Sequence, residues 1–177
     1  TTLFRSASAS VAVPVLQTDA SINPGNSGGA LLNAQAELIG INVALASTDT
    51  SATAGSDGLG FAIPSNLAVR VAEALIAGER PSHGLLGVSV VESRQDTDAD
   101  ADREGGLIAE VVSGGAADRA GLRVGDVITA VDGVAVDSST AVSAMVRLHP
   151  GESTVTIAYS RDGKAGEVEV TLGTLEW

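Results

Sequence analysis

The sequence contains no cysteine and few aromatic or basic residues. Without cysteine there can be no disulfide bond, zinc–thiolate site or thiol nucleophile. Aromatic residues make up 2% of the chain and hydrophobic residues 44%, so we expect a core of valine, leucine, isoleucine and alanine. Lys and Arg number 10 against 22 Asp and Glu, which gives a formal net charge of −12. Nucleic acids and anionic membrane surfaces are therefore not expected partners, because both require a basic face.

Long apolar runs are also missing. No uninterrupted run approaches the ~20 residues that a membrane-spanning helix needs, and no charged segment followed by an apolar one marks a signal peptide. The first residue is threonine and not methionine. We therefore expect the chain to be part of a longer protein, with membrane attachment only through an anchor outside it.

The chain divides into two expected domains, residues 1–80 and 81–177, at a polar linker around Pro81. Both halves combine runs of β-branched and aliphatic residues with a few amphipathic helical patterns, so we expect mainly β-structure with some α-helix. Predicted strands are Val11–Leu16, Gly29–Asn33, Leu38–Ala46, Leu59–Ile63, Leu86–Val91, Leu107–Val112, Val127–Val131, Thr154–Ser160 and Glu167–Leu172. One predicted helix begins with Ser65 as its N-cap and is ended by Gly78. Two further helices are predicted near Ala116–Ala120 and Ser138–Leu148.

A serine among glycines at Gly25-Asn26-Ser27-Gly28-Gly29 is the main candidate for chemistry. A serine nucleophile needs a general base and hydrogen-bond donors for the oxyanion that forms on attack. A tight turn here can direct the backbone N–H groups of Gly25 and Ser27 at one point. The alternative is a turn serine at the entry of a strand.

Four sequence blocks in order resemble the HtrA/Deg family of serine proteases. They are Gln17-Thr18-Asp19-Ala20, Ile22–Gly29, Leu38-Ile39-Gly40-Ile41-Asn42 and Gly60-Phe61-Ala62-Ile63-Pro64. The resemblance implies part of a chymotrypsin-like β-barrel followed by a PDZ domain of the bacterial, circularly permuted type. It also implies an ATP-independent serine endopeptidase of protein quality control and the stress response, with no metal or organic cofactor.

By this resemblance Ser27 is the nucleophile, and Gly25 and Ser27 supply the oxyanion-hole N–H groups. Ile22 and Leu45 resemble residues that line a small apolar specificity pocket, which implies cleavage of misfolded proteins after small apolar residues. The alternative for Ile22 and Leu45 is that they are ordinary core residues.

The partners of the nucleophile are absent from the expected places. The family's histidine and aspartate precede the serine, but no histidine lies among the 26 residues before Ser27. The two histidines, His83 and His149, match no catalytic position, and we expect Asp19 to make local hydrogen bonds to the turn. A chain with the nucleophile but no base retains at best residual catalysis, so we expect this chain to be inactive alone.

The second half contains Gly84-Leu85-Leu86-Gly87-Val88, which resembles the carboxylate-binding loop of PDZ domains. Backbone N–H groups there can hold a peptide carboxylate, and the peptide can add as a strand beside the next segment. The stretch Gly114–Ile128 strengthens the resemblance, although an ordinary strand entry is the alternative. The residues expected to bind apolar C-termini are Leu85, Leu86, Gly87, Val88, Ala141, Val142 and Met145.

Two further segments have competing interpretations. The alternating aspartates of Asp96–Asp102 begin like a calcium loop, but Ala101 and Leu107 stand where such a loop needs glycine and glutamate, so we prefer a solvated insertion. The terminal Trp177 could act as a PDZ ligand for another copy, and a frayed tail is the alternative. No metal site is predicted.

The expected partners are unfolded or misfolded polypeptides and apolar C-termini, in a bacterial cell envelope or periplasm. A partial barrel leaves apolar edges uncovered, so we also expect a homo-oligomer. The alternative function is a non-catalytic peptide-binding PDZ module or scaffold.

Overall fold

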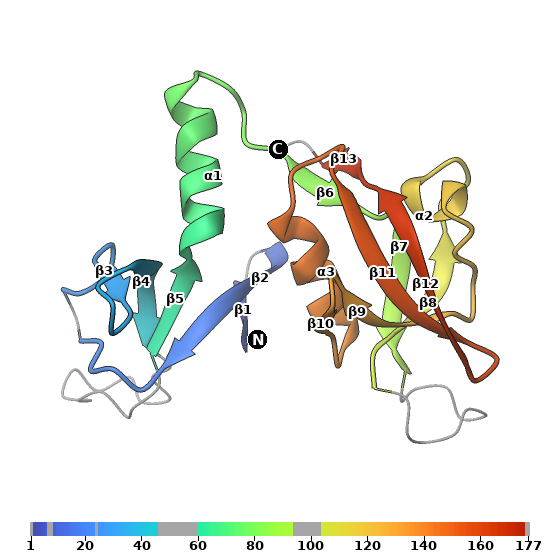
Figure 1. Cartoon of the computed structure of the whole chain (residues 1–177), viewed down its shortest axis with the longest axis horizontal. Helices are drawn as coiled ribbons and strands as arrows, with labels where there is room; N and C mark the ends of the chain where they lie inside the picture. Colours follow the sequence, from blue (N-terminus) through green and yellow to red (C-terminus); the bar gives the residue numbers. More distant parts are fainter. Residues whose placement is uncertain (1, 7–8, 24, 46–59, 94–103, 176–177) are drawn as a thin grey trace. The chain divides into compact units, whose positions relative to one another are not determined.

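Strands make up most of both halves of the chain in the computed structural model (Figure 1), which describes all residues except 1, 7–8, 24, 46–59, 94–103 and 176–177. The acidic segment Asp96–Asp102, for which a solvated insertion is expected, and Trp177 lie outside the described residues. The strands are β1 (Thr2–Ser6), β2 (Ala9–Thr18), β3 (Ala30–Leu32), β4 (Leu38–Leu45), β5 (Gly60–Pro64), β6 (His83–Leu85), β7 (Val88–Glu92), β8 (Gly106–Val111), β9 (Val127–Val131), β10 (Val134–Ala135), β11 (Thr154–Arg161), β12 (Lys164–Thr171) and β13 (Gly173–Leu175). The helices are α1 (Ser65–Ile76), α2 (Ala116–Arg119) and α3 (Ser139–Leu148).

The chain separates into two compact units. The first consists of residues 1–4 and 14–81, and the second of residues 5–13 and 82–177. The domain limits predicted from the sequence, 1–80 and 81–177, remain a proposal.

A five-stranded sheet with the order β1-β2-β5-β4-β3 forms the frame of the first half. Strand β4 pairs with both β3 and β5 in antiparallel register, and α1 packs on β4 and β5. Among the described side chains, the buried apolar ones of this half are Val15, Ile22, Ala62 and Leu67. The strand Thr2–Ser6 was not predicted, because its short polar-flanked run has no clear period-2 pattern.

Helix α1 starts one residue earlier than a cap at Ser65 would place it. Pro64 occupies the N-cap position and makes no side-chain cap, so the prediction of Ser65 as the cap was wrong. The fixed φ of proline suits a helix start, and Ser65 becomes the first helical residue. The helix ends as expected before Gly78, which adopts φ +74° and donates its amide to Leu75.

The second half is built on a sheet with the order β12-β11-β9-β8-β7, with β10 paired to β9. Helix α3 contacts β6, β7, β8 and β9. The first and last short strands of this half, β6 and β13, pair with each other in antiparallel register. The fully buried aliphatic side chains are Ile108, Ile128, Val131, Val142, Val155, Ile157, Val170 and Leu172.

Candidate functional site: a serine turn and a peptide groove

The turn around Ser27 is attached to strand β4 by backbone hydrogen bonds. Gly28 donates its amide to the Asn42 carbonyl at 2.8 Å, and the Asn42 amide donates to the Gly29 carbonyl at 2.9 Å. Gly25 and Gly28 adopt φ values of +101° and +82°, which side chains other than glycine rarely take. The glycines on both sides of Ser27 are therefore required by the backbone path of the turn.

The Ser27 side chain is exposed, and its Oγ donates a hydrogen bond to the Val43 carbonyl at 3.1 Å. A second contact orders the turn, because Asn26 Nδ2 donates to the Ser21 carbonyl at 3.2 Å. The Ser27 hydroxyl is therefore accessible to a substrate and held next to β4.

The backbone amides expected to form the oxyanion hole are those of Gly25 and Ser27. Among the described residues, neither amide donates to an acceptor, whereas the Asn26 amide between them is used by the Asn23 carbonyl at 3.0 Å. Two N–H groups near the hydroxyl are thus available to an incoming oxygen atom.

The predicted pocket residues Ile22 and Leu45 both lie next to Gly60. Leu45 is the register partner of Gly60 across the β4–β5 ladder. The buried Ile22 side chain occupies the space that a Cβ on Gly60 would need. The side chain of Leu45 itself is outside the described part of the structure. The strand register and the Ile22 contact therefore bring both positions next to Gly60, a residue that was not predicted from the sequence to lie beside them.

The histidines lie with other residues of the second half. His83 Nδ1 is 2.8 Å from the Arg147 carbonyl, and His149 Nε2 is 3.5 Å from an Asp132 carboxylate oxygen. Asp19 is exposed, and it makes no hydrogen bond to the described residues of the Ser27 turn. The expected local role of Asp19 was therefore wrong, because the Thr18 hydroxyl and the Ser21 carbonyl accept the nearby N–H groups instead.

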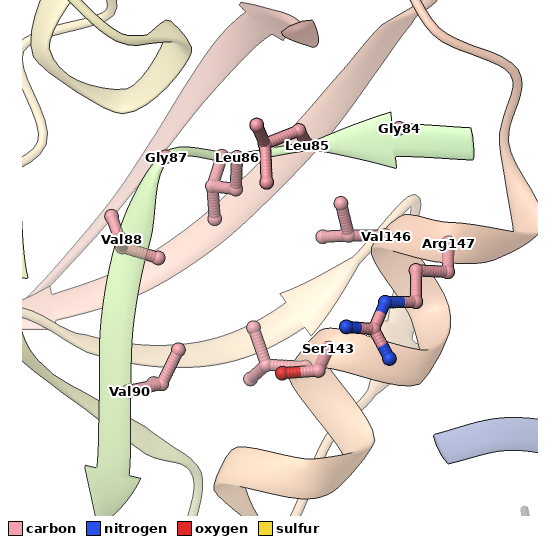
Figure 2. A pocket seen from close by; sticks show the side chains of 10 residues that line it. Gly84, Leu85, Leu86, Gly87, Val88, Val90, Ser143, Val146 and Arg147 are labelled. Carbon is pink, nitrogen blue, oxygen red and sulfur yellow. The ribbon is translucent and has the colours of Figure 1, made fainter. Parts of the chain in front are cut away.

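A groove of about 110 Å³ lies between α3 and the segment that leads from β6 into β7 (Figure 2). Most of its lining residues are apolar, and the helix side also contributes one hydroxyl and one guanidinium. The lining residues are Gly84, Leu85, Leu86, Gly87, Val88, Val90, Val142, Ser143, Val146 and Arg147.

The groove contains part of the predicted binding set. Leu85, Leu86, Gly87, Val88 and Val142 line it, whereas Ala141 and Met145 do not and are buried. Helical geometry explains why these two residues are excluded. Side chains four residues apart share one face of a helix, so the face that lines the groove carries Val142 with Val146 and Ser143 with Arg147. Extending the i, i+4 spacing from Val142 would have indicated Val146.

The loop at Gly87 directs two amide groups away from the protein's own acceptors. The Leu86 carbonyl accepts from the Ala117 amide and the Gly87 carbonyl from the Val112 amide, both at 2.9 Å. In a trans peptide the N–H points opposite to the carbonyl. The amides of Gly87 and Val88 therefore point away from these partners, and such aligned N–H groups form an anion-binding nest.

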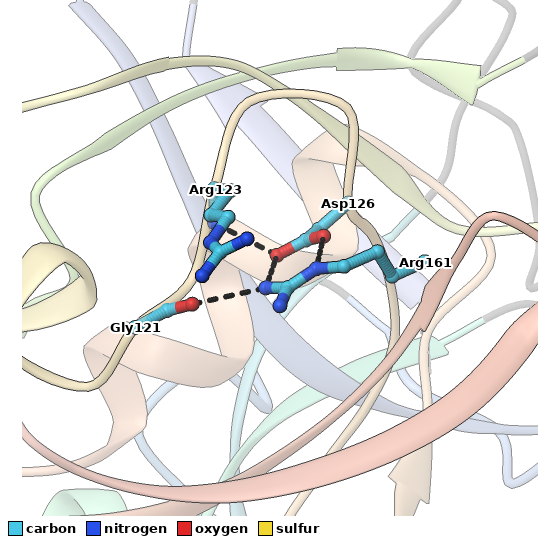
Figure 3. Close-up of polar contacts among 4 residues, drawn as sticks. All are labelled: Gly121, Arg123, Asp126 and Arg161. Atoms are coloured by element: carbon cyan, nitrogen blue, oxygen red, sulfur yellow. Dashed lines mark hydrogen bonds and ion pairs between the residues drawn. The ribbon is translucent and has the colours of Figure 1, made fainter.

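A buried carboxylate anchors the segment that follows α2 (Figure 3). Asp126 is 1% exposed; its oxygens bind Arg161 Nε at 2.6 Å and Nη2 at 2.7 Å, and one also accepts the Arg123 amide. Arg161 Nη2 also donates to the Gly121 carbonyl. The side-chain hydrogen bond with Asp126 raises the pKa of Arg161 above its usual value, so the guanidinium stays protonated.

Two kinds of feature are absent from the described residues. No group of three or more His, Asp or Glu side chains there has an arrangement that could hold a metal ion. None of the described helices combines the length and hydropathy of a transmembrane span.

Comparison with known proteins identifies the family. The trypsin family model matches residues 2–71, and the PDZ domain family model matches residues 84–172. The serine protease PepD of Mycobacterium tuberculosis is 45% identical over 165 residues, covering 91% of this chain and 34% of that protein. The chain belongs to the HtrA family, with a trypsin-like part and a PDZ domain.

Other relatives agree with this HtrA assignment. The periplasmic pH-dependent serine endoprotease DegQ of Escherichia coli is 42% identical, covering 90% of this chain and 35% of that protein. The solved structure of the HtrA-type protease AlgW with a decapeptide has a TM-score of 0.57 and 32% identity, covering 99% of this chain and 54% of that one. The chain spans about a third of the length of these curated relatives.

Proposed function

We propose that this chain carries the nucleophile, the oxyanion hole and the peptide-binding module of a serine endopeptidase. The observation that carries the proposal is the accessible Ser27 hydroxyl, held against β4 in a turn that leaves the amides of Gly25 and Ser27 available. The names of the relatives as serine proteases support it. In this proposal residues 1–80 are protease and residues 81–177 are the PDZ domain.

The general base of this enzyme is proposed to come from outside the chain. Both histidines have partners in the second half, and a carbonyl oxygen, which is no base at neutral pH, receives the Ser27 hydrogen bond. An imidazole and a carboxylate supplied by another segment would take the Ser27 proton and hold the imidazolium. The chain by itself is then expected to cleave no peptide bond.

The proposed substrates are unfolded or misfolded polypeptides, cut after small apolar residues without ATP. Ile22 narrows the space next to Gly60, where Leu45 is also placed by the strand register. A small apolar side chain is the type that such a confined apolar site accepts. Because relatives are named periplasmic, we propose an extracytoplasmic location and a role in protein quality control under stress.

Fluorophosphonate labelling tests the protease proposal, because these probes react with serines activated by a base and an oxyanion hole. The longer protein that contains this chain should be labelled, its Ser27→Ala variant should not, and the chain alone should remain unlabelled. If the longer protein resisted labelling while folded, Ser27 would be a turn residue. Labelling of the isolated chain would show that it has its own base.

A second proposed function is the binding of peptide C-termini in the groove. The amides of Gly87 and Val88 are oriented to bind a carboxylate, and most of the neighbouring side chains are apolar. A peptide that ends in valine should bind this chain, and the same peptide with an amidated end should bind at least about tenfold more weakly, since charge-assisted hydrogen bonds are lost. Equal binding of both peptides would contradict this function.

Self-association is the remaining part of the proposal. Several large apolar side chains of the first half are exposed, among them Ile76 at 86%, Leu75 at 61% and Leu32 at 53%. Burial of such side chains between copies would remove apolar area from water. Light scattering should show a homo-oligomer, and a monomer at all concentrations would contradict this part.

A further inference from the structure

Arg147 places a positive charge on the wall of the peptide groove. It lies in the last turn of α3 and lines the groove one helical turn after Ser143. Figure 2 shows its side chain running back along the helix to the level of Ser143. Long helical side chains usually point toward the N-terminus in this way, so the guanidinium lies beside the path of a bound peptide.

The Arg147 guanidinium has no partner among the described residues. No described carboxylate forms an ion pair with it, and it donates no hydrogen bond to a described residue; only the Arg147 backbone carbonyl has a hydrogen-bond partner, in His83. Arg161, in contrast, is bound by Asp126, and the Arg119 guanidinium donates to the Gly114 carbonyl. Arg147 is therefore a cation in the groove that no described carboxylate neutralises.

The other end of the groove strand carries the opposite charge. Glu92 ends β7 and accepts a hydrogen bond from Ser139 Oγ at the start of α3, at 2.6 Å. A peptide whose carboxylate is held at Gly87 and Val88 runs along β7, so its last residues lie near Arg147. Residues further upstream advance by ~3.3 Å each toward Glu92.

We propose that Arg147 makes the groove selective for peptides with an acidic side chain at one of the two positions before an apolar C-terminal residue. The inference rests on the proposed binding of C-termini in this groove. An aspartate or glutamate there gains an ion pair with a cation that has no other partner. A neutral side chain gains nothing from it, and an acidic side chain near Glu92 meets a like charge.

The test uses short fluorescent peptides that end in valine and differ at a single position. One carries glutamine at both preceding positions, one glutamate at the second-last position and one glutamate at the third-last. Anisotropy titrations compare the chain with Arg147→Gln, Arg147→Lys and the control Arg123→Gln. Arg123 has an exposed side chain and does not line the groove, so the control removes the same charge elsewhere.

One glutamate peptide should bind about fivefold more tightly than the glutamine peptide, as expected for a partly exposed ion pair. The preference should vanish in Arg147→Gln, persist in Arg123→Gln, survive in part in Arg147→Lys and weaken with added salt. Equal affinity of all three peptides for the unmodified chain would overturn the inference and leave groove binding intact, and so would a preference that persists in Arg147→Gln. If no peptide bound, the proposed groove function itself would fail, and the inference with it.

Discussion

The hydroxyl of Ser27 donates its hydrogen bond to the backbone carbonyl of Val43, at 3.1 Å. A carbonyl can orient a hydroxyl, but it cannot take its proton at neutral pH, so this contact positions the side chain without activating it. The strand that holds the proposed nucleophile is part of this chain, and we propose that the group that would activate it is supplied by another segment.

Replacing Ser27 by alanine should barely change the stability of the fold. The side chain is exposed and contributes one neutral hydrogen bond, so we expect the Tm to fall by less than about 4 °C. Thermal unfolding followed by circular dichroism measures this. In contrast, Gly28→Ala should cost about 1–2 kcal/mol, because Gly28 has φ +82°. A large loss for Ser27→Ala would favour the structural role of a turn serine.

Gly60→Ala should disturb the proposed specificity pocket. A Cβ there would overlap the Ile22 side chain and lie 3.2 Å from Thr18 Cγ2, so we expect a loss of about 1–3 kcal/mol in the free energy of unfolding. Chemical denaturation of Gly60→Ala, Ile22→Ala and the double variant measures their coupling. The double variant should lose less than the sum of the single variants, and strict additivity would mean that the two positions do not meet.

Asp126→Asn should destabilise the second half by breaking its contact with Arg161. An asparagine amide can accept with only one atom, and its NH₂ group would face the guanidinium donors. Because Asp126 is buried, we expect the Tm to fall by at least about 5 °C. Asp162→Asn is the matched control: it removes an exposed negative charge beside Arg161 and leaves the Asp126 contact in place. Equal Tm values for both variants would contradict the role of Asp126.

Ser143→Phe should block the groove without unfolding the protein. Ser143 is half-buried on the groove wall, and Figure 2 shows its Oγ directed into the space between α3 and β7. A phenyl ring would fill that space, so peptide binding should fall at least about tenfold, whereas Ser143→Ala should bind nearly normally. Anisotropy titration with a valine-terminated peptide checks both, and unchanged binding by Ser143→Phe would show that peptides bind elsewhere.

The turns and glycine positions were the most predictable part of the fold. Asp132-Gly133 and Asp162-Gly163 have positive φ at both residues, as the sequence of a tight hairpin indicates. The pairing of β6 with β13 was not predictable, because both strands have three residues and lie far apart in the sequence. The two strands become neighbours only when the whole second half has folded.

The site could be predicted to the level of motifs but not of every side chain. A turn at Ser27 could be predicted from its glycines, and Gly25 and Gly28 indeed adopt the positive φ values that glycine favours. The choice of Ala141 and Met145 over Val146 as groove residues depended on the rotation of α3, which the sheet beneath it sets. The contribution of Gly60 depended on the strand register, which no local pattern in the sequence specifies.

The pairing of β6 with β13 makes neighbours of the first and last strands of the second half. A short linker could therefore join Leu175 to His83, and new ends could be opened at the exposed Asp162-Gly163 turn. Such a rearranged chain would keep every strand neighbour that the present one has. The fold of this half therefore does not depend on which of its strands comes first in the chain, and a circularly permuted form should adopt the same structure.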